Sequence, residues 1–368
     1  MIVGIPKEIK TEEYRVGAPP TAVEVLTKAG HQVLVQNTAG EGSGFTDEEY
    51  IKAGATMVKS AKELYDRAEM IYQVKEPIPG EYPLLKKDQI HFRYLHLAAE
   101  EKLTHVLMEK GITAIAFETI ETPDGKTPCL DPMSAIAGRI ATQVAAQFIG
   151  RMYKGMGKLL GGVPGVPPAT VVVVGGGVVG TNAAEMALGL GARVIMVTRN
   201  LLRLRYLEEI FHGRFETLAS NSFNIAQAVK EADVVVGAVL VKGGRAPTMV
   251  TKEMVKTMKP GSVIVDVAID QGGCIETSRA TTHKDPIYIV NDVIHYAVTN
   301  MPGMVPRTST LALSNATLPY ALKLANMGWQ KAMKADKPLS KGLNVWNGKV
   351  TNKFVADSLS LEYTPFQP

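Results

Sequence analysis

The sequence predicts an α/β protein of two domains, and three observations support this prediction. Segments rich in β-branched residues alternate with amphipathic segments along most of the chain, which is typical of parallel βαβ units. Near the middle of the chain, a glycine-rich turn lies between one such strand and one such helix. The chain has 368 residues, which is more than a single hydrophobic core usually organises.

The composition argues against several classes of protein. The chain is 46% hydrophobic and 21% charged, as in ordinary globular proteins. Its net charge of +4 is small, and no basic run with interleaved aromatic residues suggests nucleic-acid binding. No stretch reaches the ~18 apolar residues that a membrane span needs, and the N-terminus does not resemble a secretory signal. The two cysteines, Cys129 and Cys274, are typical of a reducing compartment, so we expect a cytoplasmic protein.

Strands and helices alternate in the N-terminal part of the chain. Thr46 and Glu49 form a capping box, which predicts a short helix to about Ala53. The other predicted helices are Thr21–Ala29 and Glu100–Lys110, and the predicted strands are Ile2–Gly4, Gln32–Gln36, Met70–Val74, Gln89–Leu95 and Thr113–Phe117. These elements predict a first α/β domain.

A long helical stretch, Ala135–Met152, is expected to connect the domains, with Ser134 as its N-cap. A glycine-rich loop, Gly161–Pro168, precedes the second domain. The strands predicted there are Val171–Val174, Val194–Thr198, Phe215–Leu218, Val234–Val239 and Val263–Val267. Beyond Pro306, one helical stretch, Thr308–Ala335, is expected to cross back and complete the first domain.

The glycine-rich turn reads T-V-V-V-V-G-G-G-V-V-G from Thr170, so that Gly175, Gly177 and Gly180 are spaced G-x-G-x-x-G. The first glycine allows a tight turn, the second lets a pyrophosphate approach the backbone, and the third lets the following helix pack closely. Because a strand precedes the motif and a helix and a second strand follow it, the pattern predicts a dinucleotide-binding Rossmann domain. A purely structural glycine turn is the alternative.

Four polar residues stand at positions where parallel sheets bind ligands. Lys75 and His96 follow strands of the first domain, Asp270 follows a strand of the second, and Arg15 lies in the first polar turn. Each alone suits a structural role as well. Together they provide a carboxylate binder, a group to polarise a carbonyl and a group that titrates near neutrality, a set suited to hydride transfer at a small oxo or amino acid.

These residues lie within longer motifs that resemble the alanine dehydrogenase family. The resemblance runs along nearly the whole chain, through M-I-V-G-I-P-K-E-I-K at the N-terminus and the segments Tyr14–Gly17, Val74–Pro77, Tyr94–Ala99, Gly161–Val166, Val265–Gly273 and Asn300–Thr310. It implies reversible conversion of L-alanine, NAD and water to pyruvate, ammonium and NADH. It also implies a homohexamer, a substrate domain formed by residues 1–128 and 307–368, and a dinucleotide-binding domain formed by residues 129–306.

The resemblance also implies roles for individual residues. Arg15 would pair with the substrate carboxylate and Lys75 would polarise the oxo or imino group, with His96 and Asp270 as catalytic residues. The residues expected to contact NAD(H) or NADP(H) are Ser134, Gly175, Gly177, Val178, Val179, Gly180, Thr198, Arg199, Arg203, Ser220, Val239, Leu240, Val267, Asp270, Arg279, Asn300 and Met301. No metal site is expected.

The sequence departs from the family pattern in two regions, one at the expected cofactor site and one near the expected substrate site. Thr198 stands at the end of the second Rossmann strand, where the family usually has an aspartate that binds the adenosine ribose. With Arg199 and Arg203 close by, this predicts relaxed or NADP-leaning cofactor use. The other departures are Ala18, Gln73, His91, Arg93 and Asp131, and they leave the preferred substrate open.

Two other functions remain as alternatives. One is a module that binds NAD without substrate chemistry of its own, like the NAD-binding component of proton-translocating transhydrogenase. The other is an amino-acid dehydrogenase with a larger substrate, like saccharopine dehydrogenase. Neither nucleic acid nor a membrane is expected as a partner.

Overall fold

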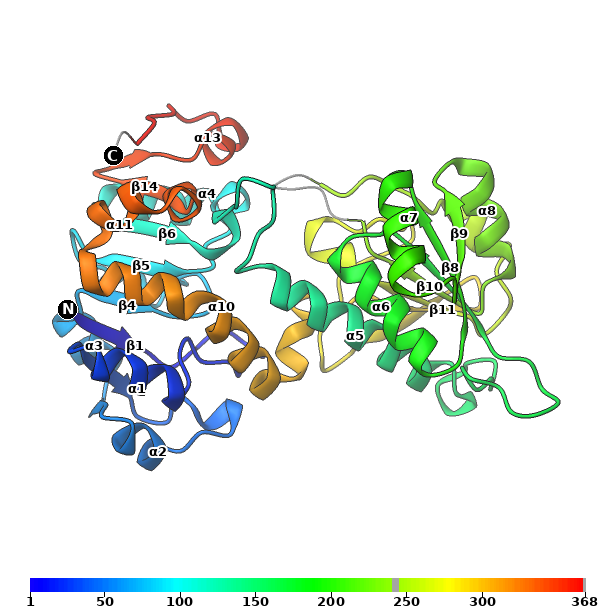
Figure 1. Ribbon diagram of the computed structural model, residues 1–368, viewed down its shortest axis with the longest axis horizontal. Helices are drawn as coiled ribbons and strands as arrows, with labels where there is room; N and C mark the ends of the chain where they lie inside the picture. Colours follow the sequence, from blue (N-terminus) through cyan, green and yellow to red (C-terminus); the bar gives the residue numbers. More distant parts are fainter. Residues whose placement is uncertain (240–244, 367–368) are drawn as a thin grey trace. The chain divides into compact units, whose positions relative to one another are not determined.

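The computed structural model describes residues 1–239 and 245–366 (Figure 1). The chain forms two compact units, one made of Met1–Met133 with Val305–Pro368 and the other of Ser134–Met304. Each unit contains one mainly parallel β-sheet with helices. The predicted fold class, two α/β domains of which one is inserted in the other, is confirmed. No helix in the described part of the chain is long and apolar enough to cross a membrane.

The sheet of the first unit has eight strands in the order β15-β14-β6-β5-β4-β1-β2-β3. Strands β1 to β6 are parallel, whereas β14 pairs antiparallel with β6 and β15 antiparallel with β14. The strands are β1 (Ile2–Ile5), β2 (Gln32–Gln36), β3 (Thr56–Val58), β4 (Met70–Tyr72), β5 (Ile90–Arg93), β6 (Thr113–Ala116), β14 (Leu343–Trp346) and β15 (Lys349–Val350). The sequence analysis missed β3, β14 and β15.

The helices of the first unit come from both ends of the chain (Figure 1). They are α1 (Pro20–Lys28), α2 (Asp47–Lys52), α3 (Ala61–Arg67), α4 (Glu101–Glu109), α10 (Pro306–Met327), α11 (Trp329–Ala335), α12 (Lys337–Lys341) and α13 (Lys353–Leu359). The predicted capping box of Thr46 and Glu49 is confirmed at the start of α2. The predicted single helix Thr308–Ala335 is wrong in one respect, because Gly328 at φ 72° separates α10 from α11.

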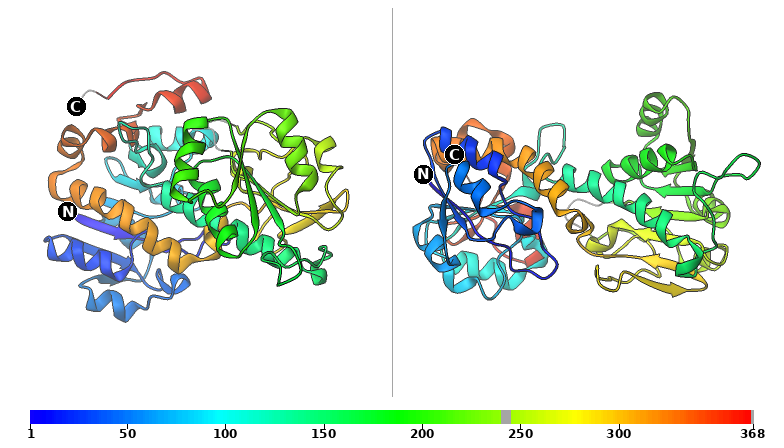
Figure 2. Two further views of the ribbon diagram at one scale, coloured as in Figure 1. Left: turned by 45° about the vertical axis from the view of Figure 1, so that its right-hand side comes forward. Right: turned by 90° about the horizontal axis from the view of Figure 1, so that it is seen from below.

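The sheet of the second unit has seven strands in the order β12-β13-β11-β10-β7-β8-β9, and its twist is visible in Figure 2. The strands are β7 (Thr170–Val174), β8 (Arg193–Thr198), β9 (Glu216–Ala219), β10 (Val234–Gly237), β11 (Val263–Asp266), β12 (Ile287–Val290) and β13 (Val293–Tyr296). Among the described strands of this second sheet, only the β12–β13 pair is antiparallel, and it was not predicted. The helices are α5 (Asp131–Phe148), α6 (Val178–Gly189), α7 (Leu201–Ile210), α8 (Ser222–Glu231) and α9 (Lys252–Val255).

The predicted bounds of the connecting helix are wrong at both ends. Helix α5 begins at Asp131, so Ser134 lies in its first turn and is not the N-cap. Pro132 does not prevent this, since a proline fits the first helical turn, where its missing N–H has no helical partner to lose. The helix ends at Phe148, because Gly150 is extended and a separate 3₁₀ helix, Arg151–Tyr153, follows.

Candidate functional site

The first unit brings three of the predicted residues to one edge of its sheet. Arg15 lies in the loop after β1, Lys75 follows β4 and His96 follows β5. Strands β5, β4 and β1 are neighbours and parallel, so the loops at their carboxyl ends share one edge. The charges of Arg15 and Lys75 influence one another, as do those of Glu76 and His96. Arg15, Lys75 and His96 therefore form one cluster.

Arg15 is buried and already holds a carboxylate. Its Nε donates to Glu13 Oε1 at 2.7 Å and its Nη2 to Glu13 Oε2 at 2.6 Å, and both side chains are buried. Burial alone would raise the pKa of Glu13, but the Arg15 guanidinium lowers this pKa to about 2. Arg15 Nη1 reaches Met133 Sδ at 3.2 Å. The sequence analysis missed Glu13, although its position two residues before Arg15 in a polar turn was a usable signal.

The Lys75 side chain is half-buried beside other charges. Burial lowers its pKa from the ordinary lysine value, and the Arg15 cation lowers it further, against the opposing effect of Glu76 and Glu13. A lowered pKa makes an ammonium group a better proton donor near neutrality. Lys75 therefore suits hydrogen bonding to a developing charge.

Glu76, adjacent to Lys75, is a second carboxylate that the sequence analysis missed. Its Oε1 accepts a hydrogen bond from Lys10, whereas its buried Oε2 has no hydrogen-bond partner among the described residues. Burial opposes ionisation of Glu76, but the nearby Lys75 and His96 hold its pKa below the ordinary value.

His96 is exposed, and its backbone has an unusual conformation. It lies in the left-handed region at φ 51°, and its N–H donates to Glu118 Oε1 at 2.7 Å. The imidazole stacks on the Tyr94 ring, with centroids 5.7 Å apart and planes 7° from parallel. The protein thus presents an oriented imidazole to solvent at the same edge as Lys75.

The departures from the family pattern on β4 and β5 are buried. Gln73, His91 and Arg93 are each 0% exposed, so they are not changes on a solvated surface. The other two departures have local structural contacts. The Ala18 carbonyl accepts the Tyr50 hydroxyl at 2.9 Å, and Asp131 begins α5 and accepts from Thr127 Oγ1 at 3.1 Å.

In the second unit, the three motif glycines have the predicted geometry. Gly175 has φ 118°, and a Cβ there would lie 2.4 Å from the Ala238 carbonyl oxygen. A Cβ on Gly180 would lie 1.8 Å from the Gly175 carbonyl oxygen, so α6 packs on the turn as closely as glycine permits. A Cβ on Gly177 would meet nothing within 4 Å, which leaves open space beside the N-terminus of α6. This cradle fits a dinucleotide pyrophosphate.

Thr198 and Arg203 lie beside this cradle. A Cβ on Gly176 would be 3.1 Å from Thr198 Cγ2, so the threonine side chain lies against the glycine turn. Arg203, in the first turn of α7, donates from Nε to the Gly176 carbonyl at 2.9 Å and from Nη2 to Thr181 Oγ1 at 3.0 Å. Arg199 is exposed. A guanidinium group is therefore fixed next to the end of β8, where the family pattern has an aspartate.

The other predicted cofactor residues are distributed through the second unit. Val239, Ser220 and Val267 follow β10, β9 and β11, Met301 is buried, and Ser134 lies in α5. Asp270 Oδ1 accepts the Asn300 N–H at 3.3 Å, and the Arg279 guanidinium lies 4.1 Å above the centre of the Tyr288 ring. Leu240 lies outside the described residues.

Asp266 supports the segment that carries Asp270, and the sequence analysis missed it. It is the last residue of β11 and is 0% exposed. Its carboxylate accepts the N–H groups of Ala268, Cys274 and Ile275 at 3.0–3.1 Å. Asp266 thus fixes the turn around the 3₁₀ helix Val267–Gln271.

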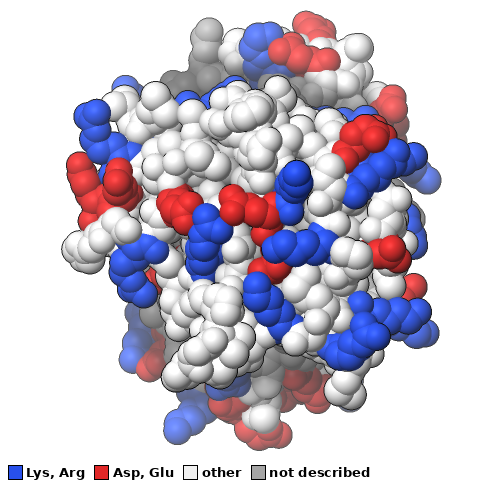
Figure 3. All heavy atoms as spheres, turned by 90° about the vertical axis from the view of Figure 1, so that its right-hand side faces the viewer, with Lys and Arg blue, Asp and Glu red and all other residues white. Residues whose placement is uncertain are grey.

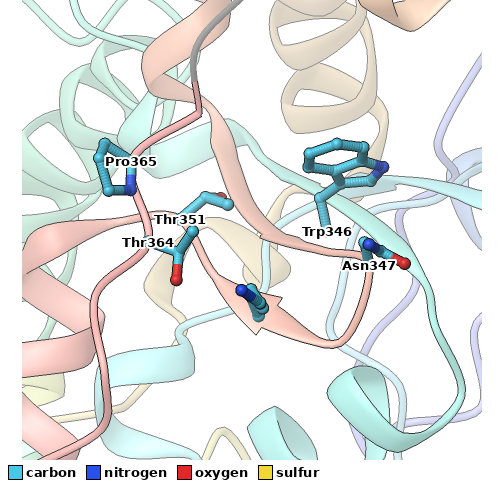
Figure 4. A pocket seen from close by; sticks show the side chains of 6 residues that line it. Trp346, Asn347, Thr351, Thr364 and Pro365 are labelled. Atoms are coloured by element: carbon cyan, nitrogen blue, oxygen red, sulfur yellow. The ribbon is translucent and has the colours of Figure 1, made fainter.

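Other surface features do not include the predicted residues. A hollow of about 130 Å³ at the β14–β15 hairpin is lined by Trp346, Asn347, Lys349, Thr351, Thr364 and Pro365 (Figure 4). Another hollow, of about 400 Å³, is lined by residues between Met156 and Pro167. On the face in Figure 3, basic and acidic side chains are interspersed. Among the described residues, no group of three or more His, Cys, Asp or Glu side chains is arranged to hold a metal ion.

The two sheets, the glycine cradle and the cluster of charged residues define a two-domain α/β protein of the Rossmann type with a nucleotide-binding central unit. Two family models match the chain. One, described as alanine dehydrogenase/PNT, N-terminal domain, matches residues 4–137, and the other, described as alanine dehydrogenase/PNT, C-terminal domain, matches residues 141–353. The chain belongs to the alanine dehydrogenase/PNT family, and the resemblance found in the sequence is confirmed.

Individual proteins are similar over nearly the full length. An alanine dehydrogenase of Methanococcus maripaludis is 56% identical, covering 99% of this chain and 98% of that protein. A solved structure named L-alanine dehydrogenase is 54% identical with a TM-score of 0.95, covering 98% of this chain and 99% of that one. A transhydrogenase structure from Sinorhizobium meliloti is 25% identical with a TM-score of 0.83, covering 95% of this chain and 100% of that one.

Proposed function

We propose that this protein is an L-alanine dehydrogenase, which catalyses the reversible oxidative deamination of L-alanine to pyruvate and ammonium with hydride transfer to a nicotinamide cofactor. The observation that carries the proposal is the cluster of Arg15, Lys75 and His96 at one edge of the first sheet. Full-length relatives with this name, more than 50% identical, support the same reaction.

We further propose that residues 1–128 and 307–368 form the substrate domain and residues 129–306 the dinucleotide-binding domain. The position of Arg15, Lys75 and His96 in one compact unit supports the first assignment. The glycine cradle in the other unit supports the second.

In the proposed reaction, Arg15 binds the substrate carboxylate and Lys75 donates a hydrogen bond to the oxo or imino group. These interactions orient the substrate and stabilise charge that develops at the reacting carbon, effects that contribute several kcal/mol in such sites, on the order of 3–4 for a single donor. The oxidised nicotinamide, when bound, accepts the hydride from the substrate Cα. His96 takes a proton from the water that adds to the imino carbon and returns a proton to the departing amine.

Asp270 is proposed as a further catalytic carboxylate. Its position in the turn fixed by Asp266 and its hydrogen bond from Asn300 support an oriented carboxylate there. The remaining cofactor contacts stay as proposed from the resemblance: Ser134, Ser220, Val239, Leu240, Val267, Arg279, Asn300 and Met301.

The cofactor is proposed to be NAD(H) or NADP(H), held at its pyrophosphate by Gly175, Gly177, Gly180 and the first-turn amides of α6 at Val178 and Val179. Relaxed or NADP-leaning use is proposed from the end of β8. A carboxylate there would repel a 2′-phosphate, whereas Thr198 is uncharged and Arg203 is fixed beside it. Loss of one close like-charge contact changes affinity by on the order of 1–4 kcal/mol at surface-like dielectric. Arg199 is a second cation adjacent to this position.

A homohexamer, proposed on the family resemblance alone, and a cytoplasmic location, proposed from the two cysteines, complete the proposal. The observation that supports the transhydrogenase-like alternative is the structural similarity of this chain to the transhydrogenase from Sinorhizobium meliloti. A module without its own substrate chemistry does not need the cluster of Arg15, Lys75 and His96, and this argues for the dehydrogenase. A larger substrate, as in saccharopine dehydrogenase, remains the second candidate.

A spectrophotometric screen tests the proposal. The purified protein is mixed with ammonium and pyruvate, or with bulkier 2-oxo acids, in the presence of NADH or NADPH, and cofactor oxidation is followed. Pyruvate is expected to give the highest kcat/KM, and Lys75→Ala is expected to abolish turnover without weakening cofactor binding. If none of the 2-oxo acids led to cofactor oxidation, the proposal would be overturned. A higher kcat/KM for a bulkier acid than for pyruvate would favour the second candidate.

A further inference from the structure

The backbone of Lys75 is held by side chains from two other strands and loops. The pairing between the segments that continue β4 and β5 ends just before it, with the Gln73 N–H donating to the Phe92 carbonyl at 3.3 Å and the Tyr94 N–H to the Val74 carbonyl at 3.0 Å. Beyond Val74, strand neighbours no longer supply the partners. Lys75 therefore needs other groups to fix its peptide units.

Glu8 and Arg93 supply these groups on opposite sides of Lys75. Glu8 Oε1 accepts the N–H of Val74 at 2.7 Å and the N–H of Lys75 at 3.2 Å. Arg93 Nε donates to the Lys75 carbonyl oxygen. All three hydrogen bonds involve an ionisable side chain, and a bond to a charged group is stronger than a bond between neutral groups.

We propose that Arg93 and Glu8 are positioning residues, which hold the backbone of Lys75 from both sides and so fix the direction in which its ammonium group meets the substrate. The inference rests on the proposed function of Lys75. It goes beyond that function because neither Arg93 nor Glu8 is assigned a contact with substrate or cofactor.

The burial of the pair explains why both charges are needed. Arg93 is 0% exposed and Glu8 is 8% exposed, and an isolated charge at such a depth is costly. The pKa of Glu8 is raised to about 7, because burial and the nearby Glu13 and Glu81 raise it by more than the Arg93 cation and the Val74 N–H lower it. Arg93 thus keeps Glu8 more ionised than it would otherwise be. Removing Arg93 therefore abolishes the hydrogen bond to the Lys75 carbonyl and weakens the bond that Glu8 accepts from the Lys75 N–H.

A small polar network fixes the pair in turn. The Gln73 amide donates to Glu8 Oε2 at 3.3 Å, and Arg93 Nη1 donates to the Tyr65 hydroxyl at 3.4 Å. Arg93 Nη2 lies 3.9 Å from Glu81 Oε2, too far for a hydrogen bond but close enough for an ion pair. The departures at Gln73 and Arg93 are therefore parts of one network behind Lys75, and they need not change the substrate.

The test compares variants of this pair with a matched control on the same strand. Arg93→Lys keeps the charge but not the planar fork, Arg93→Met removes both, and Glu8→Gln keeps an acceptor without the charge. His91→Leu is the control, because His91 lies on the same face of β5, is equally buried, and hydrogen-bonds Gln89 where Arg93 hydrogen-bonds Lys75. The measurements are kcat/KM for pyruvate, KM for NADH, and amide hydrogen exchange of residues 73–76.

We expect kcat/KM for pyruvate to fall about tenfold or more in both Arg93 variants, with Arg93→Lys the milder, because small displacements of a catalytic group are costly. In Glu8→Gln, kcat/KM for pyruvate is expected to fall less. In all three variants we expect KM for NADH to stay unchanged. Amide hydrogen exchange at residues 73–76 should accelerate in proportion to the loss of kcat/KM. His91→Leu is expected to behave like the unmodified protein in activity and in exchange at residues 73–76.

If Arg93→Met does not fold, the double variant Glu8→Gln/Arg93→Met removes one charge of each sign and serves instead. Unchanged exchange and unchanged kcat/KM in Arg93→Lys and in the double variant would overturn the inference, and so would equal losses in His91→Leu. An unmodified protein without turnover would instead refute the proposed function, while hydrogen exchange would still decide whether the pair holds Lys75.

Discussion

The two glycines that end the G-x-G-x-x-G motif should fail in different ways when each is replaced by alanine. A methyl group on Gly180 would lie 1.8 Å from the Gly175 carbonyl oxygen, where ordinary contact begins at 3.4 Å. Helix α6 must then move away from the turn, and overpacking of this kind costs about 1–3 kcal/mol. For a unit of this size, 1 kcal/mol lowers Tm by about 2–4 °C, so Gly180→Ala should lower Tm by about 2–12 °C. The distorted cradle should also bind cofactor at least about tenfold more weakly.

The other glycine separates binding from stability. A methyl group on Gly177 meets nothing within 4 Å, so Gly177→Ala should leave Tm nearly unchanged. It would nevertheless project into the open space proposed for the pyrophosphate, and cofactor affinity should fall about tenfold or more. Gly189→Ala, at the far end of α6 and also in open space, is the matched control and should change neither property for the worse.

Thermal melting and cofactor titration of the three variants decide the matter. Normal cofactor affinity in Gly177→Ala would refute the position assigned to the pyrophosphate. If Gly180→Ala had the same Tm as the unmodified protein, the close contact between α6 and the turn would be relieved without cost, and the packing argument would fail.

Three further predictions concern single side chains. His96→Ala should reduce kcat by about 10²–10⁴-fold with cofactor binding intact, whereas His105→Ala, at an exposed histidine of α4, should keep full turnover in the same assay. Thr198→Asp should shift the ratio of kcat/KM values toward NADH by about tenfold or more, and an unmodified enzyme that does not use NADPH would contradict the reasoning. Glu13, with a pKa lowered to about 2, should contribute stability that is complete above its ordinary value of 4.5 and is lost as pH falls from 4.5 toward 2. The loss in the free energy of unfolding is about 3 kcal/mol in all. Urea midpoints measured between pH 3 and pH 6 should therefore vary less with pH in Glu13→Gln than in the unmodified protein. Equal variation in the two proteins would refute the effect of the Glu13–Arg15 pair.

The features that the sequence predicted correctly are set by residues close together in the chain. The glycine turn depends on the φ angle of Gly175 and on the contact between Gly180 and the Gly175 carbonyl, five positions apart, and the capping box involves only Thr46 and Glu49. Most strands of the two parallel sheets were found because their apolar runs are continuous. The resemblance to the family added the positions of Arg15 and Lys75, which no local rule distinguishes from surface charges.

The features that the sequence missed depend on contacts between distant segments. Strands β14 and β15 add to the first sheet antiparallel, and the pairing of Leu343 with Ile115 has no local signal. Glu8 holds Val74 across 66 positions, and the burial of Arg93 follows from the strands around it. From residue type alone, a glutamate after a strand is a solvated charge. Only the fold shows that Glu8 accepts the N–H groups of Val74 and Lys75.

The pairing of charges around Lys75 has a consequence for how a substrate is recognised. Glu13 already accepts hydrogen bonds from Nε and Nη2 of Arg15, so a substrate carboxylate bound as proposed would share this guanidinium with a protein carboxylate. Two carboxylates on one guanidinium repel each other unless a second cation lies close, and Lys75 is that cation. The direction of its ammonium group then matters for binding as well as for turnover. A backbone held by two buried charges is therefore better suited to this site than one held by the weaker bonds of a strand end.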